Sequence, residues 1–284
     1  MIRRFGLKTF LEKLAKLMSK FIAAMDHSGG STGGVLERYG CEYTEENKMD
    51  LVHEMRLRMI NSPDFNSSNI WASILYKDSV ERGAAAVLKS KGIESILKVD
   101  SGCHMSGLLK DFPLDDMIDY AISKGCTGTK MRSIVKSPMI LNAVLDQQFD
   151  LAERIYARGL IPIVEPEIPI EHEQKQELEI SLFKELEKHL DEFTGKCILK
   201  LTLPQQPNTY KPLTKHKNVN KIVGLSGGYT TEESCRRLSN NDDMTASFSR
   251  ALSEGLFITQ SDDEFNAQLS RNINMIVQSG FNIY

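Results

Sequence analysis

Short runs of apolar residues recur along the 284-residue chain, and stretches with helical periodicity separate them. Most of the runs are continuous rather than alternating, which is typical of strands that are buried on both faces. Between them, stretches such as residues 138–158 place Leu141, Val144 and Leu145 at the spacing of one helix face. Eight segments are predicted as strands: residues 21–25, 70–76, 93–99, 127–131, 160–164, 197–203, 219–225 and 245–249.

Regular alternation of strand and helix implies a parallel sheet, and eight repeats imply that the sheet closes on itself. We therefore predict the α/β class and a (β/α)8 TIM barrel, which forms one domain over residues 1–284. No low-complexity linker divides the chain. A doubly wound sheet is the alternative fold, but no GxGxxG motif follows a predicted strand.

Two helical segments differ from the rest of the repeat. Residues 1–20 gather Phe5, Phe10, Leu14 and other apolar side chains on one face, with most Arg and Lys residues elsewhere. We expect an amphipathic N-terminal helix packed on the barrel, and a membrane-surface helix or a targeting segment is the alternative. Residues 171–188 are dense in Glu, Lys and Gln, which predicts a solvated helix.

Composition narrows the choice of partners. The net charge of -3 and the pI of about 6.1 provide no basic field for nucleic acid, and no apolar run is long enough for a stable membrane association. Five cysteines, never spaced as CxxC, favour reduced thiols in a cytoplasmic protein.

The six histidines lack metal-binding spacing, so no metal and no other cofactor is predicted. The composition is compatible with a homo-oligomer.

Lys200 is the clearest sign of chemistry, because it interrupts a predicted strand that is otherwise apolar. Burial disfavours the ammonium form, and a neutral amine is a nucleophile that forms a Schiff base with a carbonyl compound. A lysine that reaches solvent from an edge strand is the alternative. Further ionisable residues occur at or near the carboxyl ends of other strands, where barrel active sites lie: Asp26, Lys98, Asp100, Lys130, Arg132, Glu165 and Glu167.

Two small-residue segments are candidates for binding anions. Residues 226–228 (Ser-Gly-Gly) follow strand seven, and Arg250 is expected at the end of strand eight. The loops after these two strands commonly bind phosphate in such barrels. Residues 28–32 (Ser-Gly-Gly-Ser-Thr) follow Asp26, and they either bind a second phosphate or form a plain glycine turn into a helix.

With these residues in this order, the chain resembles class I fructose-1,6-bisphosphate aldolase, especially the short bacterial-type form. The likeness extends from about residue 21 to residue 263. The most specific motifs are FIAAMDHSGGST (residues 21–32), GTKMR (128–132), IVEPE (163–167), LSGG (225–228) and SFSRAL (247–252).

The resemblance implies a role for each site residue. Lys200 would be the Schiff-base lysine, Glu165 the acid and base for carbinolamine dehydration, and Asp26 the group that handles the proton of the C4 hydroxyl. Lys130 would assist this proton chemistry, and Glu167 is a further catalytic candidate. The residues implied at the C1 phosphate are Ser226, Gly227 and Arg250, and those at the other end of the substrate are Ser28, Ser31, Lys98 and Arg132.

The implied activity is reversible cleavage of fructose 1,6-bisphosphate, a sugar-phosphate substrate, in glycolysis or gluconeogenesis. Alternatives are a Schiff-base aldolase for another sugar phosphate and a barrel that serves as a binding scaffold through its N-terminal helix. Helix-start basic residues of the larger animal-type enzymes are replaced here by Gly33, Gly34 and Val35, so the resemblance does not imply their contacts to the second phosphate for this chain. The role of the terminal tyrosine of those enzymes is not carried over to Tyr284.

Overall fold

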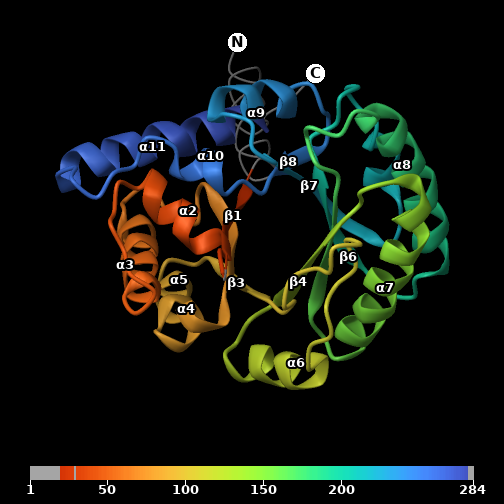
Figure 1. Cartoon of the computed structure of the whole chain (residues 1–284), viewed down its shortest axis with the longest axis horizontal. Helices are drawn as coiled ribbons and strands as arrows, with labels where there is room; N and C mark the ends of the chain where they lie inside the picture. Colours follow the sequence, from red (N-terminus) through yellow and green to blue (C-terminus); the bar gives the residue numbers. More distant parts are fainter. Residues whose placement is uncertain (1–19, 29, 281–284) are drawn as a thin grey trace, which may run out of the picture.

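A computed structural model describes residues 20–28 and 30–280, and within them the predicted barrel is confirmed (Figure 1). Eight strands form one sheet in sequence order from β1 to β8, and all neighbouring pairs are parallel. The strands are β1 (Phe21–Met25), β2 (Ile70–Leu75), β3 (Glu94–Lys98), β4 (Gly128–Ile134), β5 (Ile161–Glu167), β6 (Cys197–Thr202), β7 (Val219–Leu225) and β8 (Met244–Ala246).

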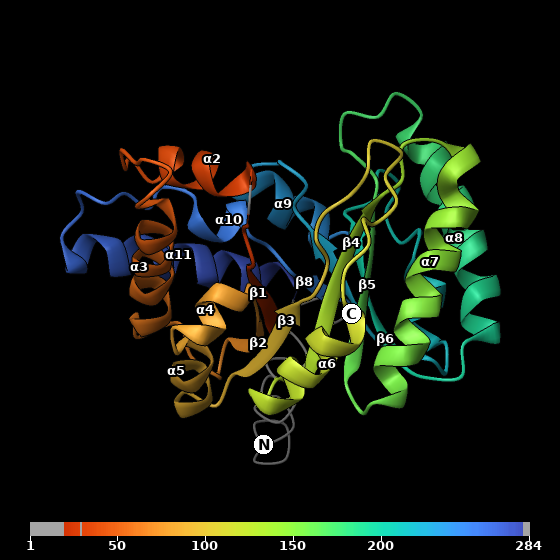
Figure 2. The ribbon, with the colours of Figure 1, turned by 60° about the horizontal axis from the view of Figure 1, so that its bottom comes forward.

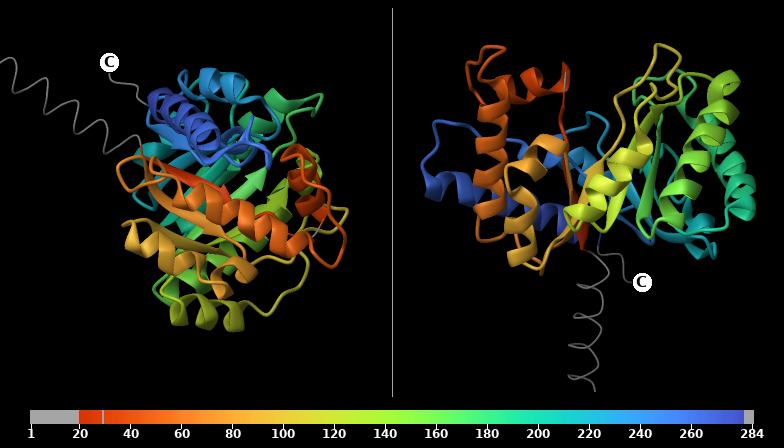
Figure 3. Two further views of the ribbon diagram at one scale, coloured as in Figure 1. Left: turned by 90° about the vertical axis from the view of Figure 1, so that its left-hand side faces the viewer. Right: turned by 90° about the horizontal axis from the view of Figure 1, so that it is seen from below.

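The ring of strands comes together between β1 and the segment that follows β8, where the Ala24 amide donates to the Phe248 carbonyl at 3.1 Å. Helices surround the ring, with α2 to α5 on one side and α7 and α8 on the opposite side (Figures 1 and 3). The helices are α2 (Gly30–Arg38), α3 (Lys48–Asn61), α4 (Lys77–Glu81), α5 (Ala84–Ser90), α6 (Leu114–Ser123), α7 (Pro138–Ala157), α8 (Lys175–Glu192), the 3-10 helix η1 (Lys211–Lys215), α9 (Thr231–Leu238), α10 (Arg250–Ser253) and α11 (Asp262–Ser279).

Each strand is buried on both faces, which explains the continuous apolar runs of the sequence. Side chains alternate along a strand, so one set points into the barrel and the other toward the helices. Met131, Leu199 and Leu201 belong to the large outer core that packs against the helices. The inner core is small and aliphatic, and it consists of Ile22, Ala24, Ala72, Ile74, Ile96, Ile163, Ile198 and Val223.

Strand limits depart from the prediction where polar residues interrupt the apolar pattern. Both β4 and β5 extend three residues further than predicted, because their ladder continues to the pair Ile134 and Glu167. The prediction that Arg250 ends strand eight is wrong, since β8 ends at Ala246 and Ser249 is the N-cap of α10. Arg250 therefore begins a helix, although it stays at the same end of the barrel.

The helix predicted over residues 171–188 runs instead over Lys175–Glu192, and it is solvated on one side only. Leu178, Leu182, Leu186 and Leu190 recur every four residues and are buried against the barrel. The amphipathic helix predicted for residues 1–20 lies outside the described residues except for its last position. Among the residues that the structure describes, no helix combines the length and the apolar character that a membrane crossing requires.

Candidate active site

The charged residues of the site follow directly on the inner aliphatic core. In four strands, an inward aliphatic residue is followed two positions later by an ionisable one, in the second half of the strand or just beyond its carboxyl end. These pairs are Ala24 and Asp26, Ile96 and Lys98, Ile163 and Glu165, and Ile198 and Lys200. Because side chains two apart share a face, the aliphatic layer closes the barrel and the charged layer faces the cavity above it.

A cavity of about 830 Å³ opens at this end of the barrel, a volume that suits a small organic ligand. Seven Lys and Arg side chains and four carboxylates line it, so the excess of positive charge favours an anionic ligand. Ser31 falls in α2, and its side chain lies outside the described part of the structure. The other predicted site residues all line this one cavity: Asp26, Ser28, Lys98, Lys130, Arg132, Glu165, Glu167, Lys200, Ser226, Gly227 and Arg250.

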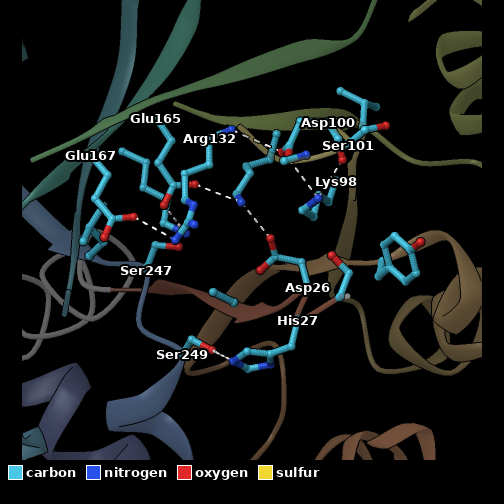
Figure 4. Close-up of a pocket in the computed structure, with 18 of the residues that line it drawn as sticks. Asp26, His27, Lys98, Asp100, Ser101, Arg132, Glu165, Glu167, Ser247 and Ser249 are labelled. Atoms are coloured by element: carbon cyan, nitrogen blue, oxygen red, sulfur yellow. Dashed lines mark hydrogen bonds and ion pairs between the residues drawn. The ribbon is translucent and has the colours of Figure 1, made fainter. Parts of the chain in front are cut away.

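At the floor of the cavity, Lys200 and Glu165 are in contact. Lys200 is only 4% exposed, which excludes the alternative of a lysine that reaches solvent from an edge strand. Its Nζ lies 3.1 Å from Glu165 Oε1. Lys130 Nζ lies 3.0 Å from Glu165 Oε2 and 2.7 Å from Asp26 Oδ2. Figure 4 shows Glu165 and Asp26 on either side of this chain of ion pairs. An amine, a carboxyl group and a second carboxylate are thus within proton-transfer distance of one another through Lys130.

Charge pairing determines the protonation states of this cluster. Burial works against the Asp26 carboxylate, but the Lys130 and Lys200 ammonium groups outweigh it, so the pKa of Asp26 lies well below its usual value. Burial also opposes the Lys130 ammonium, but Asp26, Glu165 and Asp100 raise the pKa of Lys130 well above its usual value. Asp26 therefore stays ionised at neutral pH, and Lys130 stays a proton-bearing donor.

Two further ion pairs lie closer to the mouth of the cavity. Arg132 Nη1 contacts Glu167 Oε2 at 3.0 Å, and burial raises the pKa of Glu167 above its usual value. Lys98 Nζ contacts Asp100 Oδ1 at 2.9 Å. The Asp100 carboxylate also accepts hydrogen bonds from the backbone amides of Gly102 at 2.9 Å and Arg132 at 3.2 Å. Asp100 thus joins the end of β3 to β4 and neutralises Lys98.

The turn after β7 has the geometry of an anion site. Gly227 and Gly228 both have positive φ angles, +60° and +125°, which residues other than glycine rarely adopt. The Arg250 guanidinium packs over this turn, with Nη1 3.2 Å from where a Cβ on residue 228 would lie. A buried Ser226 hydroxyl and an arginine are therefore presented beside an open backbone turn.

This arrangement suits a covalent reaction with a phosphorylated carbonyl compound. A buried lysine that faces a cavity beside a carboxyl group can form an imine with a carbonyl compound, because the carboxyl group can protonate the departing hydroxyl of the carbinolamine. Arginines and glycine turns bind phosphate. Among residues 20–28 and 30–280, the structure brings together no group of three His, Cys, Asp or Glu side chains that could hold a metal ion.

Comparison with curated proteins identifies relatives over nearly the whole chain. A fructose-bisphosphate aldolase class 1 from Synechocystis is 44% identical over 289 aligned residues, which cover 94% of this chain and 96% of the relative. A fructose-bisphosphate aldolase class 1 from Clostridium acetobutylicum is 42% identical over 278 residues, 91% of this chain and 94% of the relative. The chain belongs to the class 1 fructose-bisphosphate aldolases. No family model matches the chain.

Solved structures confirm the aldolase barrel as the fold. A fructose-bisphosphate aldolase from Plasmodium falciparum, crystallised with TRAP and a small-molecule inhibitor, superposes with a TM-score of 0.73 at 18% identity. The alignment covers 95% of this chain and 94% of that one. An archaeal fructose 1,6-bisphosphate aldolase gives a TM-score of 0.59 at 12% identity, over 95% and 98% of the two chains.

Several polar residues of this aldolase site were not among the predicted site residues. His27 Nε2 lies 2.6 Å from Ser249 Oγ and so joins the residue after Asp26 to the residue before Arg250. Ser247 lines the cavity, and its buried hydroxyl has no partner among the described residues. Asp100 follows the end of β3 and was noted as an ionisable residue near a strand end, but the sequence did not indicate which groups it would contact. For His27 and Ser249, the sequence offered one sign of a place in the site: each is next to a predicted site residue, Asp26 and Arg250 respectively.

Proposed function

We propose that the protein catalyses the reversible cleavage of fructose 1,6-bisphosphate to dihydroxyacetone phosphate and glyceraldehyde 3-phosphate through an imine on Lys200. The observation that carries the proposal is the buried Lys200 Nζ, 3.1 Å from Glu165 Oε1, at the floor of a cationic cavity. Membership of the class 1 fructose-bisphosphate aldolases supports the same reaction.

In the first half of the reaction, Lys200 passes a proton to Glu165, and the neutral amine attacks the C2 carbonyl of the open-chain ketose. A proton then moves from the new bond's nitrogen to the oxygen, which gives a carbinolamine and leaves Glu165 protonated. Glu165 gives a proton to the departing hydroxyl, so water leaves and a protonated imine remains. The 3.1 Å distance between Lys200 Nζ and Glu165 Oε1 places this acid beside the atom that forms the new bond. Lys130 stays positively charged and keeps Glu165 oriented from its other oxygen, at 3.0 Å.

In the second half, Asp26 accepts the proton of the C4 hydroxyl while the bond between C3 and C4 breaks. The electron pair of that bond moves into the protonated imine, which becomes an enamine, and glyceraldehyde 3-phosphate leaves. Protonation of the enamine at C3 and hydrolysis of the imine then release dihydroxyacetone phosphate and restore Lys200. The contact of Lys130 with Asp26 at 2.7 Å supports this role, because it holds the carboxylate ionised.

The substrate phosphates bind at the two sides of the cavity. Ser226, Gly227 and Arg250 hold the C1 phosphate, a role supported by the open glycine turn beside the guanidinium. The other end of the substrate lies near Ser28, Ser31, Lys98 and Arg132. Among these, Lys98 and Arg132 already pair with Asp100 and Glu167, so they act mainly through the total charge of this side.

Borohydride trapping tests the proposal directly. We expect reduction in the presence of fructose 1,6-bisphosphate to leave a stable adduct, and peptide mass spectrometry to locate it on Lys200. The same treatment with fructose 1-phosphate and deoxyribose 5-phosphate identifies the preferred substrate class. An adduct on another lysine, or none with any ketose phosphate, would overturn the proposal. Activity is expected to survive EDTA, and loss of activity with the chelator would indicate metal-dependent chemistry instead.

A further inference from the structure

The cationic side chains of the cavity differ in whether a carboxylate accompanies them. Most of them lie within 4.0 Å of one: Lys77 with Glu81, Lys98 with Asp100, Lys130 with Asp26 and Glu165, Arg132 with Glu167, and Lys200 with Glu165. Arg38 and Arg250 also line the cavity, but neither forms an ion pair with any of the residues that the structure describes. Their charge is available to a ligand.

These two arginines line the same cavity although they are 212 positions apart in the sequence. Arg38 is the last residue of α2 and Arg250 is the first residue of α10, and both views in Figures 1 and 2 show the two helices next to each other. Partial burial, followed by the charge of Arg250, lowers the pKa of Arg38 below its usual value. Two like charges at one cavity repel each other, and an anionic ligand bound in the cavity offsets this repulsion.

The Arg38 side chain lies over Gly34, one helical turn earlier on α2. Residues four apart lie on the same helix face, and Arg38 Nη1 lies 3.5 Å from where a Cβ on Gly34 would be. Gly34 is one of the three residues that replace the helix-start basic residues of the larger animal-type enzymes. Arg38 thus brings a guanidinium back over the place where this chain lacks a basic residue.

We infer that Arg38 determines specificity for a bisphosphate, by binding the substrate phosphate at the end opposite to the turn at residues 226–228. This inference rests on the proposed function and adds a residue to it. Arg38 is assigned to that end because α2 follows the β1 loop with Ser28, whereas the C1 phosphate site is built on β7 and α10.

Calorimetric titration with unreactive ligands tests Arg38 independently of catalysis. Hexitol 1,6-bisphosphate and hexitol 1-phosphate have no carbonyl group, so their binding does not require the lysine chemistry. We expect Arg38→Gln to weaken the bisphosphate by about 10- to 100-fold, as for other lost charge-assisted contacts, and to leave the monophosphate unchanged. Arg236→Gln removes an equal charge from α9, outside the cavity, and is expected to change neither ligand.

A rescue variant separates the charge of Arg38 from a purely structural role. Gly34→Lys in the Arg38→Gln background places an ammonium on the same helix face, and it is expected to restore part of the bisphosphate affinity. Equal weakening of both ligands by Arg38→Gln, or unchanged bisphosphate affinity, would overturn the inference. If wild-type protein binds the bisphosphate but cleaves no ketose phosphate, the proposed function fails and the assignment of Arg38 stands.

Discussion

Two of the buried lysine–glutamate pairs of the barrel, Lys200 with Glu165 and Lys175 with Glu179, have similar burial but different surroundings. Lys200 and Lys175 are each 4% exposed, and their partners Glu165 and Glu179 are 3% and 0% exposed. Lys200 lies on β6 and reaches Glu165 on β5, whereas Lys175 and Glu179 are one turn apart on α8. Burial of a lysine therefore does not by itself distinguish a reactive group from a structural one.

The difference lies in what else contacts each pair. Lys175 pairs with Glu179 and donates to the Leu203 carbonyl at 2.9 Å, and Glu179 accepts the Gln205 amide at 2.9 Å. These contacts join α8 to the segment after β6, and burial lowers the pKa of Lys175 and raises that of Glu179. Lys200 instead faces the cavity and shares Glu165 with Lys130. A lysine whose donors are used by the protein is structural, and one that faces a cavity is available to a substrate.

Of the substitutions that test this difference between the two pairs, replacing Lys200 is expected to have the largest effect, and the effect is on turnover. We expect Lys200→Met to reduce turnover of fructose 1,6-bisphosphate by roughly 10⁴-fold or more, because the covalent route needs the amine. Met fills a similar volume, and Glu165 keeps Lys130 as a partner, so the thermal unfolding midpoint should stay close to that of wild type. Near-normal turnover in steady-state assays would reject Lys200 as the nucleophile.

The same substitution in the other pair should affect stability and not catalysis. Lys175→Met leaves Glu179 buried without its cation, so we expect the free energy of unfolding to fall by about 3–5 kcal/mol while kcat stays unchanged. Urea denaturation followed by circular dichroism measures this loss. The double variant Lys175→Met/Glu179→Leu is the control and should regain most of it. A drop in kcat with unchanged stability would give Lys175 a functional role.

A smaller effect is expected at the side of the cavity that is proposed to bind the C1 phosphate. Arg250→Ala should raise KM for fructose 1,6-bisphosphate by about 10- to 100-fold, because a charge-assisted contact to the C1 phosphate is lost. The imine on Lys200 should still form, since Arg250 is not part of the Lys200 ion-pair network. Steady-state kinetics measure the change, with Arg236→Ala on α9 as the matched control. An unchanged KM would contradict the role of Arg250.

The smallest effect concerns pH and His27, which is held near the cavity by Ser249. Burial, followed by the charge of Arg56, lowers the pKa of His27 to about 4. Because the unfolded state then binds more protons than the folded one, stability is lost as pH falls from 6.5 toward 4, by roughly 1–3 kcal/mol. Urea midpoints measured across this range should fall less in His27→Gln. Identical pH profiles for both proteins would exclude His27 as the cause.

Much of the fold and the burial of Lys200 at the cavity followed from local patterns. Continuous apolar runs predict strands buried on both faces, and an ionisable residue two positions after an inward aliphatic one, as at Ile198 and Lys200, must face the end of the barrel. Where polar residues interrupt the apolar runs, as at the ends of β4 and β8, the predicted strand limits were less accurate. The cytoplasmic location and the homo-oligomer stay predictions.

The sequence by itself determined the eight strands, their order and the inward position of Lys200 on its strand, because alternation along a strand is a local property of the backbone. Only the tertiary structure decided which side chains meet across the barrel. The contact of His27 with Ser249 and the proximity of Arg38 and Arg250 join the two ends of the chain, and they exist because β1 and β8 meet. Pairing of charges across such distances depends on where the closed sheet places each strand end, which local periodicity does not encode.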